Sequence, residues 1–180
     1  SSTAAFVFED CLIPRENLLG QHGKGLNIAL ATLDGGRIGI AAQAIGIAQA
    51  CLEQSVEYSK QRTQFGQPIC RFQAIQQKLA DIKVNIEAAR VLMHRAAWLK
   101  QHGRPFTTEA AMGKLFASEM ASRAGNHAVQ IFGGYGYCKD YPVERYLRDA
   151  KITEIYEGTS EIHRMVMGRS LVADPQRGAG

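Results

Sequence analysis

Residues 75–96 read IQQKLADIKVNIEAARVLMHRA, and this stretch decides the fold class. Apolar residues recur along it in steps of three and four, which places them on one side of a helix with about 3.6 residues per turn. The members of this stripe are Ile75, Leu79, Ile82, Ile86, Ala89, Met93 and Ala96. The pattern predicts a long amphipathic helix with one buried face, and Gly103 and Pro105 in the following QHGRPF segment predict its end.

The segment before this helix is also helical in character. Residues 26–60 are rich in Ala, Ile, Leu and Gln and contain no proline. Gly35 and Gly36 interrupt the early part, and each weakens a helix by about 1 kcal/mol relative to alanine. Residues 61–70 contain both a glycine and a proline, so they are interpreted as the connection between two helices.

The segment after residues 75–96 predicts further helices. Residues 107–132 are rich in alanine and permit close packing, with Thr107 or Thr108 as candidate N-caps. Pro142 can start a short helix, and a last helix is predicted over residues 159–171. Three long helices with short links indicate an all-α protein, namely an antiparallel four-helix bundle with additional short helices.

The opening of the chain differs from the rest. Phe6, Val7 and Phe8 have strand character, and CLIPRENLLG (11–20) is interpreted as an extended loop closed by glycine. A single strand has no pairing partner of its own, so this residual strand and loop are expected to end another domain. We therefore expect residues 1–25 to be a domain end and linker, residues 26–172 the helical bundle, and residues 173–180 a flexible tail.

The composition excludes several classes of protein. Of 180 residues, 46% are hydrophobic and 21% are charged, and the net charge of +4 is spread along the chain without a basic cluster, so no nucleic-acid partner is expected. No apolar run approaches the roughly 20 residues of a membrane span. The cysteines show no CxxC spacing and no histidine follows a glutamate by three residues, which argues against zinc and di-metal carboxylate sites. No metal is predicted.

The segment IYEGTSEIHR (155–164) raises the first functional question. Thr159 and Ser160 give a capping signal, and Glu161 puts negative charge in the first turn of the helix that follows. Glu157 is then either a catalytic base held at the entrance of a helix or a surface carboxylate beside a helix cap. The local pattern leaves both interpretations open.

Three glycine-containing motifs each allow an ordinary and a functional interpretation. DGGR (34–37) is either an irregularity in a helix or a place where bare backbone lets a ligand come close. RTQFG (62–66) carries Arg62, which is either solvated or paired with a phosphate. GGYGY (133–137) is a very weak dinucleotide signal because it follows a helix, and it is either a helix C-terminal turn or a set of backbone amides for a phosphate.

Together these motifs resemble a known family. Their order and spacing are similar to those of the C-terminal helical domain of the acyl-CoA dehydrogenases, and the resemblance covers nearly the whole chain. The stretches that carry it are LLGQHGKG (18–25), DGGRIGIAAQAIGIAQ (34–49), QRTQFGQPI (61–69), FQAIQ (72–76), QIFGGYGY (130–137), YPVERYLRDAKI (141–152) and IYEGTSEI (155–162). The DGGR and IYEGTSEI forms are most similar to the short-chain and short/branched-chain members.

The resemblance implies an architecture and a reaction. Family members have an N-terminal helical domain, a middle β-domain and a C-terminal four-helix bundle, so residues 1–25 would end the middle domain. A carboxylate removes the pro-R α-proton of a short-chain, straight or branched acyl-CoA, and the β-hydrogen leaves as hydride to N5 of FAD, which yields the trans-2-enoyl-CoA. Electrons pass to an electron-transfer flavoprotein. The enzymes are usually homotetramers, built as dimers of dimers, in the bacterial cytoplasm or the mitochondrial matrix.

The resemblance also implies site residues. The base of the family is the glutamate of IYEGT, which is Glu157 here. Some branches place the base on the first long helix, at the position of Gly36, and a glycine cannot do that work. Gly158 matches a substrate contact, and Asp34 and Arg37 match contacts at the acyl-CoA site.

The positions that match FAD contacts come from several parts of the chain. They are Arg62, Phe65, Gln73, Gln130, Gly133, Gly134, Thr159 and Glu161. Those in residues 130–134 correspond to residues that hold the ADP part of FAD from the neighbouring subunit. The alternative function is a catalytically inert helical bundle that serves oligomerisation. Because the middle domain supplies much of the isoalloxazine site, the chain alone is not expected to hold FAD tightly.

Overall fold

The computed structural model describes residues 4–172 of the chain. The chain divides into two compact units, Ser1–Thr32 and Leu33–Gly180, and helix α1 (Gly25–Gln61) runs from the first into the second. The beginning of α1 agrees with the helix predicted from residue 26 on. The tail predicted at residues 173–180 lies outside the described residues.

The first unit contains little regular structure. Residues 4–14 form no helix or strand, and a short 3-10 helix, η1 (Arg15–Asn17), follows them. The strand predicted over Phe6, Val7 and Phe8 is therefore wrong, whereas the loop after it is confirmed. A strand needs a neighbour for its backbone N–H and C=O groups, and these three residues have none and are exposed.

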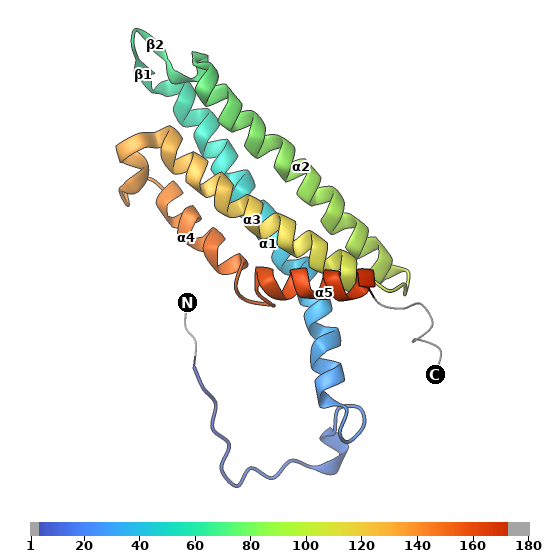
Figure 1. The fold of residues 1–180 in the computed structure, drawn as a ribbon. Coiled ribbons are helices and arrows are strands. Elements are labelled where there is room, and N and C mark those ends of the chain that lie inside the picture. Colours follow the sequence, from blue (N-terminus) through green and yellow to red (C-terminus); the bar gives the residue numbers. More distant parts are fainter. Residues whose placement is uncertain (1–3, 173–180) are drawn as a thin grey trace. The chain divides into compact units, whose positions relative to one another are not determined.

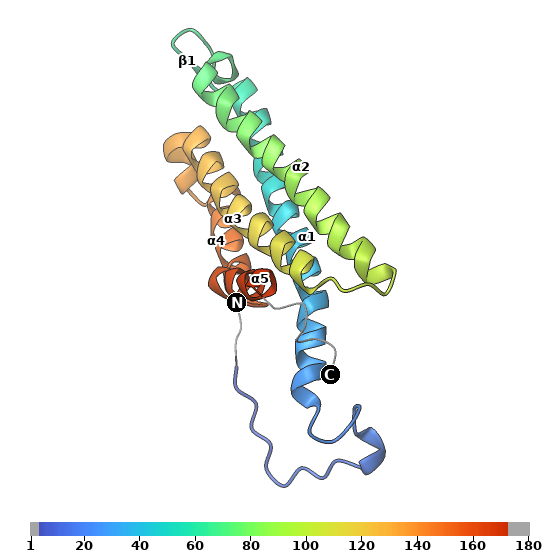
Figure 2. The same cartoon turned by 45° about the vertical axis from the view of Figure 1, so that its right-hand side comes forward.

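The second unit is a bundle of helices (Figure 1). After α1 it contains β1 (Thr63–Gln64), β2 (Gln67–Pro68), η2 (Ile69–Arg71), α2 (Gln73–Gln101), α3 (Thr107–Phe132), η3 (Gly133–Tyr137), α4 (Val143–Thr153) and α5 (Ser160–Val172). Helices α1, α2 and α3 run beside one another, α4 packs on α3, and α5 crosses near the beginning of α3 (Figures 1 and 2). The all-α antiparallel four-helix bundle with additional short helices is thus confirmed.

Helix α2 forms as the stripe of apolar residues predicts. Ile82, Ile86, Ala89 and Ala96 are buried on its inner face. The helix ends at Gln101, and Gly103 follows with a φ of 62°, a left-handed conformation that glycine adopts without a Cβ clash. The chain can therefore reverse at this point and begin α3.

Two local predictions at helix starts have different outcomes. Thr159 is confirmed as the cap of α5, because its hydroxyl accepts a hydrogen bond from the N–H of Ile162 at 3.4 Å. Thr107 and Thr108 are wrong as caps of α3, since Phe106 precedes that helix and no side chain caps it. The hydroxyl of Thr107 instead donates to Asp34 at 2.5 Å, a partner that sequence spacing does not reveal.

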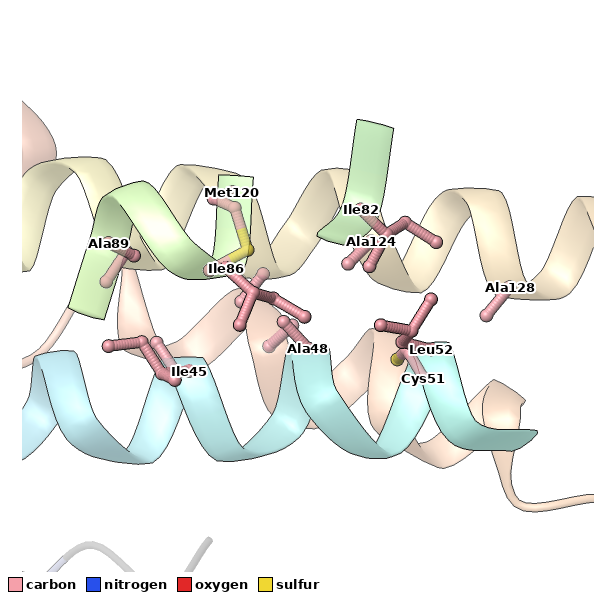
Figure 3. Packing of buried hydrophobic residues seen from close by; sticks show 14 of the residues in the cluster. Ile45, Ala48, Cys51, Leu52, Ile82, Ile86, Ala89, Met120, Ala124 and Ala128 are labelled. Atoms are coloured by element: carbon pink, nitrogen blue, oxygen red, sulfur yellow. The ribbon is translucent and has the colours of Figure 1, made fainter. Parts of the chain in front are cut away.

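The hydrophobic core lies where four helices meet, and mostly small residues build it (Figure 3). Its buried members include Ile45, Ala48, Cys51, Leu52, Ile82, Ile86, Ala89, Met120, Ala124, Ala128, Val143 and Ala150. Alanine and glycine let the helices approach closely: a Cβ on Gly125 of α3 would lie 2.9 Å from the Cα of Leu147 on α4. This close packing fixes the positions of the turns at the helix ends, where the predicted site residues lie.

Candidate active site

The predicted site residues fall into two groups at different ends of the bundle (Figure 1). The first group, which we call the base cluster, consists of Asp34, Arg37, Glu157, Gly158, Thr159 and Glu161 around the turn between α4 and α5. The second group lies at the β1–β2 hairpin and η3 and includes Arg62, Phe65, Gly133 and Gly134. The structure therefore separates Glu157 from several of the residues matched to FAD.

The turn between α4 and α5 presents Glu157. Glu157 and Gly158 have φ angles of 55° and 98°, both in the left-handed region. That conformation costs a residue with a Cβ about 1–2 kcal/mol, and such strain gathers at functional sites. The turn is closed by the N–H of Ser160, which donates to the carbonyl of Glu154 at 3.1 Å. Glu157 is thus held in a conformation that an ordinary surface residue does not need.

The carboxylate of Glu157 lies against Gly36 of α1. A Cβ built on Gly36 would be 2.5 Å from Oε2 and 3.0 Å from Cδ of Glu157, so a side chain at that position would collide with the carboxylate. Oε2 is buried and has no hydrogen-bond partner among the described residues. Helix α1 runs unbroken through Gly35 and Gly36, so the glycines do not interrupt it. At Gly36 the bare backbone leaves room for the carboxylate.

Asp34 and Arg37 bind each other one helical turn apart. The guanidinium of Arg37 donates to Oδ1 of Asp34 at 2.5 Å, and Thr107 occupies the other carboxylate oxygen. Arg37 is only 6% exposed, and its Nε has no partner among the described residues. These two side chains therefore join α1 to the beginning of α3 beside the base. Their contact with acyl-CoA stays a prediction.

Two buried titratable side chains lie behind the turn. Lys114 of α3 is fully buried and donates to the carbonyl of Gly158 at 2.6 Å. Burial lowers the pKa of Lys114 to about 8, with Glu154 and Glu157 opposing the shift and Arg37 adding to it. His163 of α5 is also fully buried, and burial, followed by the charges of Lys114 and Arg37, lowers its pKa to about 4. The histidine is thus neutral at neutral pH, whereas the lysine is mostly charged.

The low pKa of His163 makes the stability of the chain depend on pH. Between pH 6.5 and about 4, the unfolded chain binds a proton at this histidine that the folded chain does not bind, so acidification favours unfolding. We expect His163→Gln to lose less stability than the wild type across this window, by on the order of 2 kcal/mol. Urea unfolding of the 180-residue chain at stepped pH measures the difference. His102→Gln, which changes an exposed histidine, is the matched control. If the free energy of unfolding of His163→Gln fell with acidification as steeply as that of the wild type, the lowered pKa of His163 would be contradicted.

The second group surrounds a pocket of about 540 Å³, which we call the hairpin pocket. Its walls are mainly aromatic and aliphatic, and the ring of Tyr58 stacks on that of Phe132 at a centroid distance of 4.0 Å. The guanidinium of Arg62 lies over the ring of Tyr135, 5.4 Å from its centroid. Gly133 has a φ of 62° and ends α3. The pocket thus combines flat apolar surface with a cation, a combination that suits a nucleotide.

The remaining predicted cofactor residues lie beside these two groups. Gln73 is the first residue of α2, and Gln130 lies in the last turn of α3, where its carbonyl accepts the N–H of Gly133. Neither lines the hairpin pocket. Phe65 does line it and is 92% exposed. Glu161 is exposed in the first turn of α5, in the base cluster.

Sequence reasoning missed Lys114 and His163. Lys114 lies four residues after Ala110 and three before Ala117, on the small-residue face of α3 that the structure buries. A lysine on such a face is unusual, because buried lysines normally need a partner, and that signal was available. His163 offered no comparable signal, since the spacing of the histidines does not separate a buried one from exposed ones.

In residues 4–172 no helix has the length and apolar character required to cross a membrane. The same residues contain no group of three or more His, Cys, Asp or Glu side chains placed to hold a metal ion.

Comparison with known proteins gives a consistent result. The family description "Acyl-CoA dehydrogenase, C-terminal domain" matches residues 23–172. Among curated proteins, the short-chain specific acyl-CoA dehydrogenase of Megasphaera elsdenii is 60% identical over 172 residues, which are 96% of this chain and 45% of that protein. The chain thus spans less than half the length of this relative.

Solved structures agree in fold. The butyryl-CoA dehydrogenase of Megasphaera elsdenii has a TM-score of 0.92 and 60% identity over 93% of this chain and 44% of its own. A chain from a structure of the electron transferring flavoprotein of Acidaminococcus fermentans, studied for flavin-based electron bifurcation, also has a TM-score of 0.92, with 57% identity over the same shares. With this agreement in sequence and fold, the chain belongs to the acyl-CoA dehydrogenase family and corresponds to its C-terminal domain.

Proposed function

We propose that this chain is the C-terminal domain of an FAD-dependent acyl-CoA dehydrogenase that converts a short-chain, straight or branched acyl-CoA to the trans-2-enoyl-CoA. Glu157 is the base in this proposal. The observation that carries it is the position of the Glu157 carboxylate, which is held on a left-handed turn with Oε2 buried, unpartnered among the described residues and facing the bare backbone of Gly36.

The surroundings of Glu157 suit proton removal from a weak carbon acid. A general base needs free lone pairs at the reacting atom and a place sheltered from water. Oε2 of Glu157 is buried and has no hydrogen-bond partner among the described residues, so it meets both needs. Gly158 adds room for a thioester because it has no Cβ, and Asp34 and Arg37 form the neighbouring wall on α1. These three are the proposed substrate contacts.

The hairpin pocket fits the nucleotide end of FAD. Arg62, Phe65, Gly133 and Gly134 line it, and Gln73 and Gln130 are the sequence neighbours of its lining residues Phe72 and Ile131. Gln130, Gly133 and Gly134 would hold the ADP part, and Arg62, Phe65 and Gln73 would be further contacts to the cofactor. Thr159 and Glu161 would contact the cofactor beside the base. When bound, FAD supplies the hydride acceptor for the β-hydrogen. The chain itself orients the nucleotide and removes the α-proton.

The two groups of site residues also support a shared cofactor site. Because the base cluster and the hairpin pocket lie at different ends of one bundle, the pocket would serve the FAD of a neighbouring subunit. A homotetramer built as a dimer of dimers meets this requirement. Electron-transfer flavoprotein is the proposed electron acceptor, and the compartment is the cytoplasm in a bacterium or the mitochondrial matrix in a eukaryote.

The direct test is turnover by the complete enzyme that contains this chain. Purified protein would be mixed with butyryl-CoA, hexanoyl-CoA, octanoyl-CoA and 2-methylbutyryl-CoA, with electron-transfer flavoprotein or an artificial dye as acceptor. We expect bleaching of the flavin band and formation of the enoyl-CoA, fastest with a short chain. A protein that forms the oligomer but oxidises none of these thioesters would support the inert bundle instead.

The isolated 180-residue chain is expected to lose FAD. It contains the hairpin pocket for the ADP part, but the proposed middle domain supplies much of the isoalloxazine site. Gel filtration after incubation with FAD measures retention, through the absorbance of the protein peak in the visible range. A flavin band that persists in the peak at a stoichiometry near one would contradict this expectation.

A further inference from the structure

We propose that Lys114 is a positioning residue for the base: from the buried side of α3 it holds the carbonyl of Gly158, and with it the left-handed turn that aims Glu157 at Gly36. The inference deepens the proposed function and rests on Glu157 being the base. It gives Lys114, which contacts neither the substrate nor the reacting atoms in this proposal, a role in catalysis through the turn.

The first argument is the contact itself. Lys114 is fully buried, and its Nζ donates to the carbonyl of Gly158 at 2.6 Å, a short charge-assisted hydrogen bond between residues 44 positions apart in the chain. Burying an ammonium is costly unless it is paired, and the hydrogen bond to Gly158 is the pairing that the structure supplies. Here the contact is to the residue directly after the proposed base.

The second argument concerns the charges around Lys114. Its charge interacts with those of Glu154 at the end of α4, Arg37 of α1 and Glu157 of the turn, and it also acts on His163 of α5. Glu154 is already bound by Lys151 and by the hydroxyl of Ser122. No carboxylate is within salt-bridge distance of Lys114 in the described residues, so the backbone carbonyl of Gly158 is its main partner. The lysine is thus directed at the turn.

The third argument is that the turn needs a restraint. Glycine at position 158 is the most adaptable residue type, and Glu157 pays a conformational cost at its φ of 55°. His163 packs behind Gly158, where a Cβ would lie 3.1 Å from its Cε1, but its ring nitrogens have no hydrogen-bond partner in the described residues. Lys114 therefore supplies a short, directional bond to the carbonyl of Gly158, in addition to the packing of His163 and the Ser160 hydrogen bond that closes the turn.

The experiment uses the complete holoenzyme with Lys114→Met, which keeps the length of the side chain and removes the donor and charge. We expect kcat per bound FAD to fall about tenfold and KM for butyryl-CoA to stay within about twofold, because the base is misaimed while the substrate still binds. Amide hydrogen exchange over residues 155–160 should accelerate about tenfold. Lys83→Met is the matched control, since Lys83 is an exposed lysine paired with Glu87 on α2.

Two further variants separate positioning from simple structural support. Lys114→Arg keeps a charged donor and should recover at least about a third of the wild-type kcat. In a Glu157→Gln background, Lys114→Met should lower the residual rate by less than about twofold, because the group that it positions no longer acts as a base. Lys114→Gln replaces Lys114→Met in every comparison if the methionine variant does not fold.

Several outcomes overturn the inference. They are a wild-type kcat in Lys114→Met, unchanged amide exchange at residues 155–160, or the same tenfold loss in the Glu157→Gln background. Failure of the proposed function is distinguishable from these, because the wild-type enzyme would then oxidise no acyl-CoA. In that case the exchange measurement alone still decides whether Lys114 holds the turn.

Discussion

Glu157→Gln in the complete enzyme is expected to lower kcat for butyryl-CoA dehydrogenation by about 10³-fold, with little change in KM. Glutamine has nearly the shape of glutamate, so the turn and its packing against Gly36 should persist. Its amide cannot accept the α-proton at neutral pH, however, and the reaction then lacks a base. The measurement is single-turnover bleaching of the flavin at saturating substrate, normalised to bound FAD.

A matched control tests whether the loss of activity is specific to the site of Glu157. Glu53→Gln removes an exposed carboxylate on α1, outside the base cluster and the hairpin pocket, and should leave the rate within about twofold of the wild type. Normal FAD content in Glu157→Gln would show that the cofactor site is intact. Near-normal dehydrogenation by this variant would refute the assignment of Glu157 as the base.

Gly36→Ala is expected to lower the activity of the enzyme while it raises the stability of helix α1. The new Cβ would lie 2.5 Å from Oε2 of Glu157, at the end of a flexible side chain, so the carboxylate is displaced while the helix stays in place. A misplacement of about 1 Å at a reacting group can cost about 10²-fold in rate, and we expect a loss of this size in kcat. The alanine should at the same time favour helix α1 by up to about 1 kcal/mol.

Gly46→Ala on the same helix is the control for this prediction. Gly46 is exposed, and no atom lies within 4 Å of a Cβ built there, so the alanine should raise stability without affecting the base. Thermal unfolding of the 180-residue chain and turnover of the complete enzyme measure the two effects separately. If Gly36→Ala retained the wild-type kcat, the contact between Gly36 and the carboxylate would not matter for catalysis.

The course of the helices could be predicted from the sequence because their signals are local. The apolar stripe of residues 75–96 matches α2, and Gly103 follows its end with the positive φ that a helix stop of this kind uses. Thr159 caps α5 for a similar reason, since its partner Ile162 lies only three residues away. The strand over residues 6–8 could not be settled in this way, because a strand depends on a neighbour that local sequence does not describe.

For the candidate site, the sequence identified the residues but not all of their contacts. The residues matched by the resemblance could be named one by one, and Arg62, Phe65, Gly133 and Gly134 do line one pocket. The pairing of Asp34 with Arg37 is local, since the two residues lie three positions apart on α1. The use of Thr107 as a second partner of Asp34 could not be predicted, because it depends on how α1 and α3 pack, and helix patterning alone does not fix the rotation of one helix against another.

The sequence by itself determined the helical bundle, most of the helix bounds and the family to which Glu157 owes its assignment as a base. Only the tertiary structure decided that the carboxylate of Glu157 faces Gly36, 121 positions earlier in the chain, and that Lys114 holds the next residue from behind. The physical reason is the distance along the chain over which each kind of interaction acts. Helix propensity and capping act over a few residues, whereas the aim of a base is fixed by burial and hydrogen bonds between segments that meet only when the core packs.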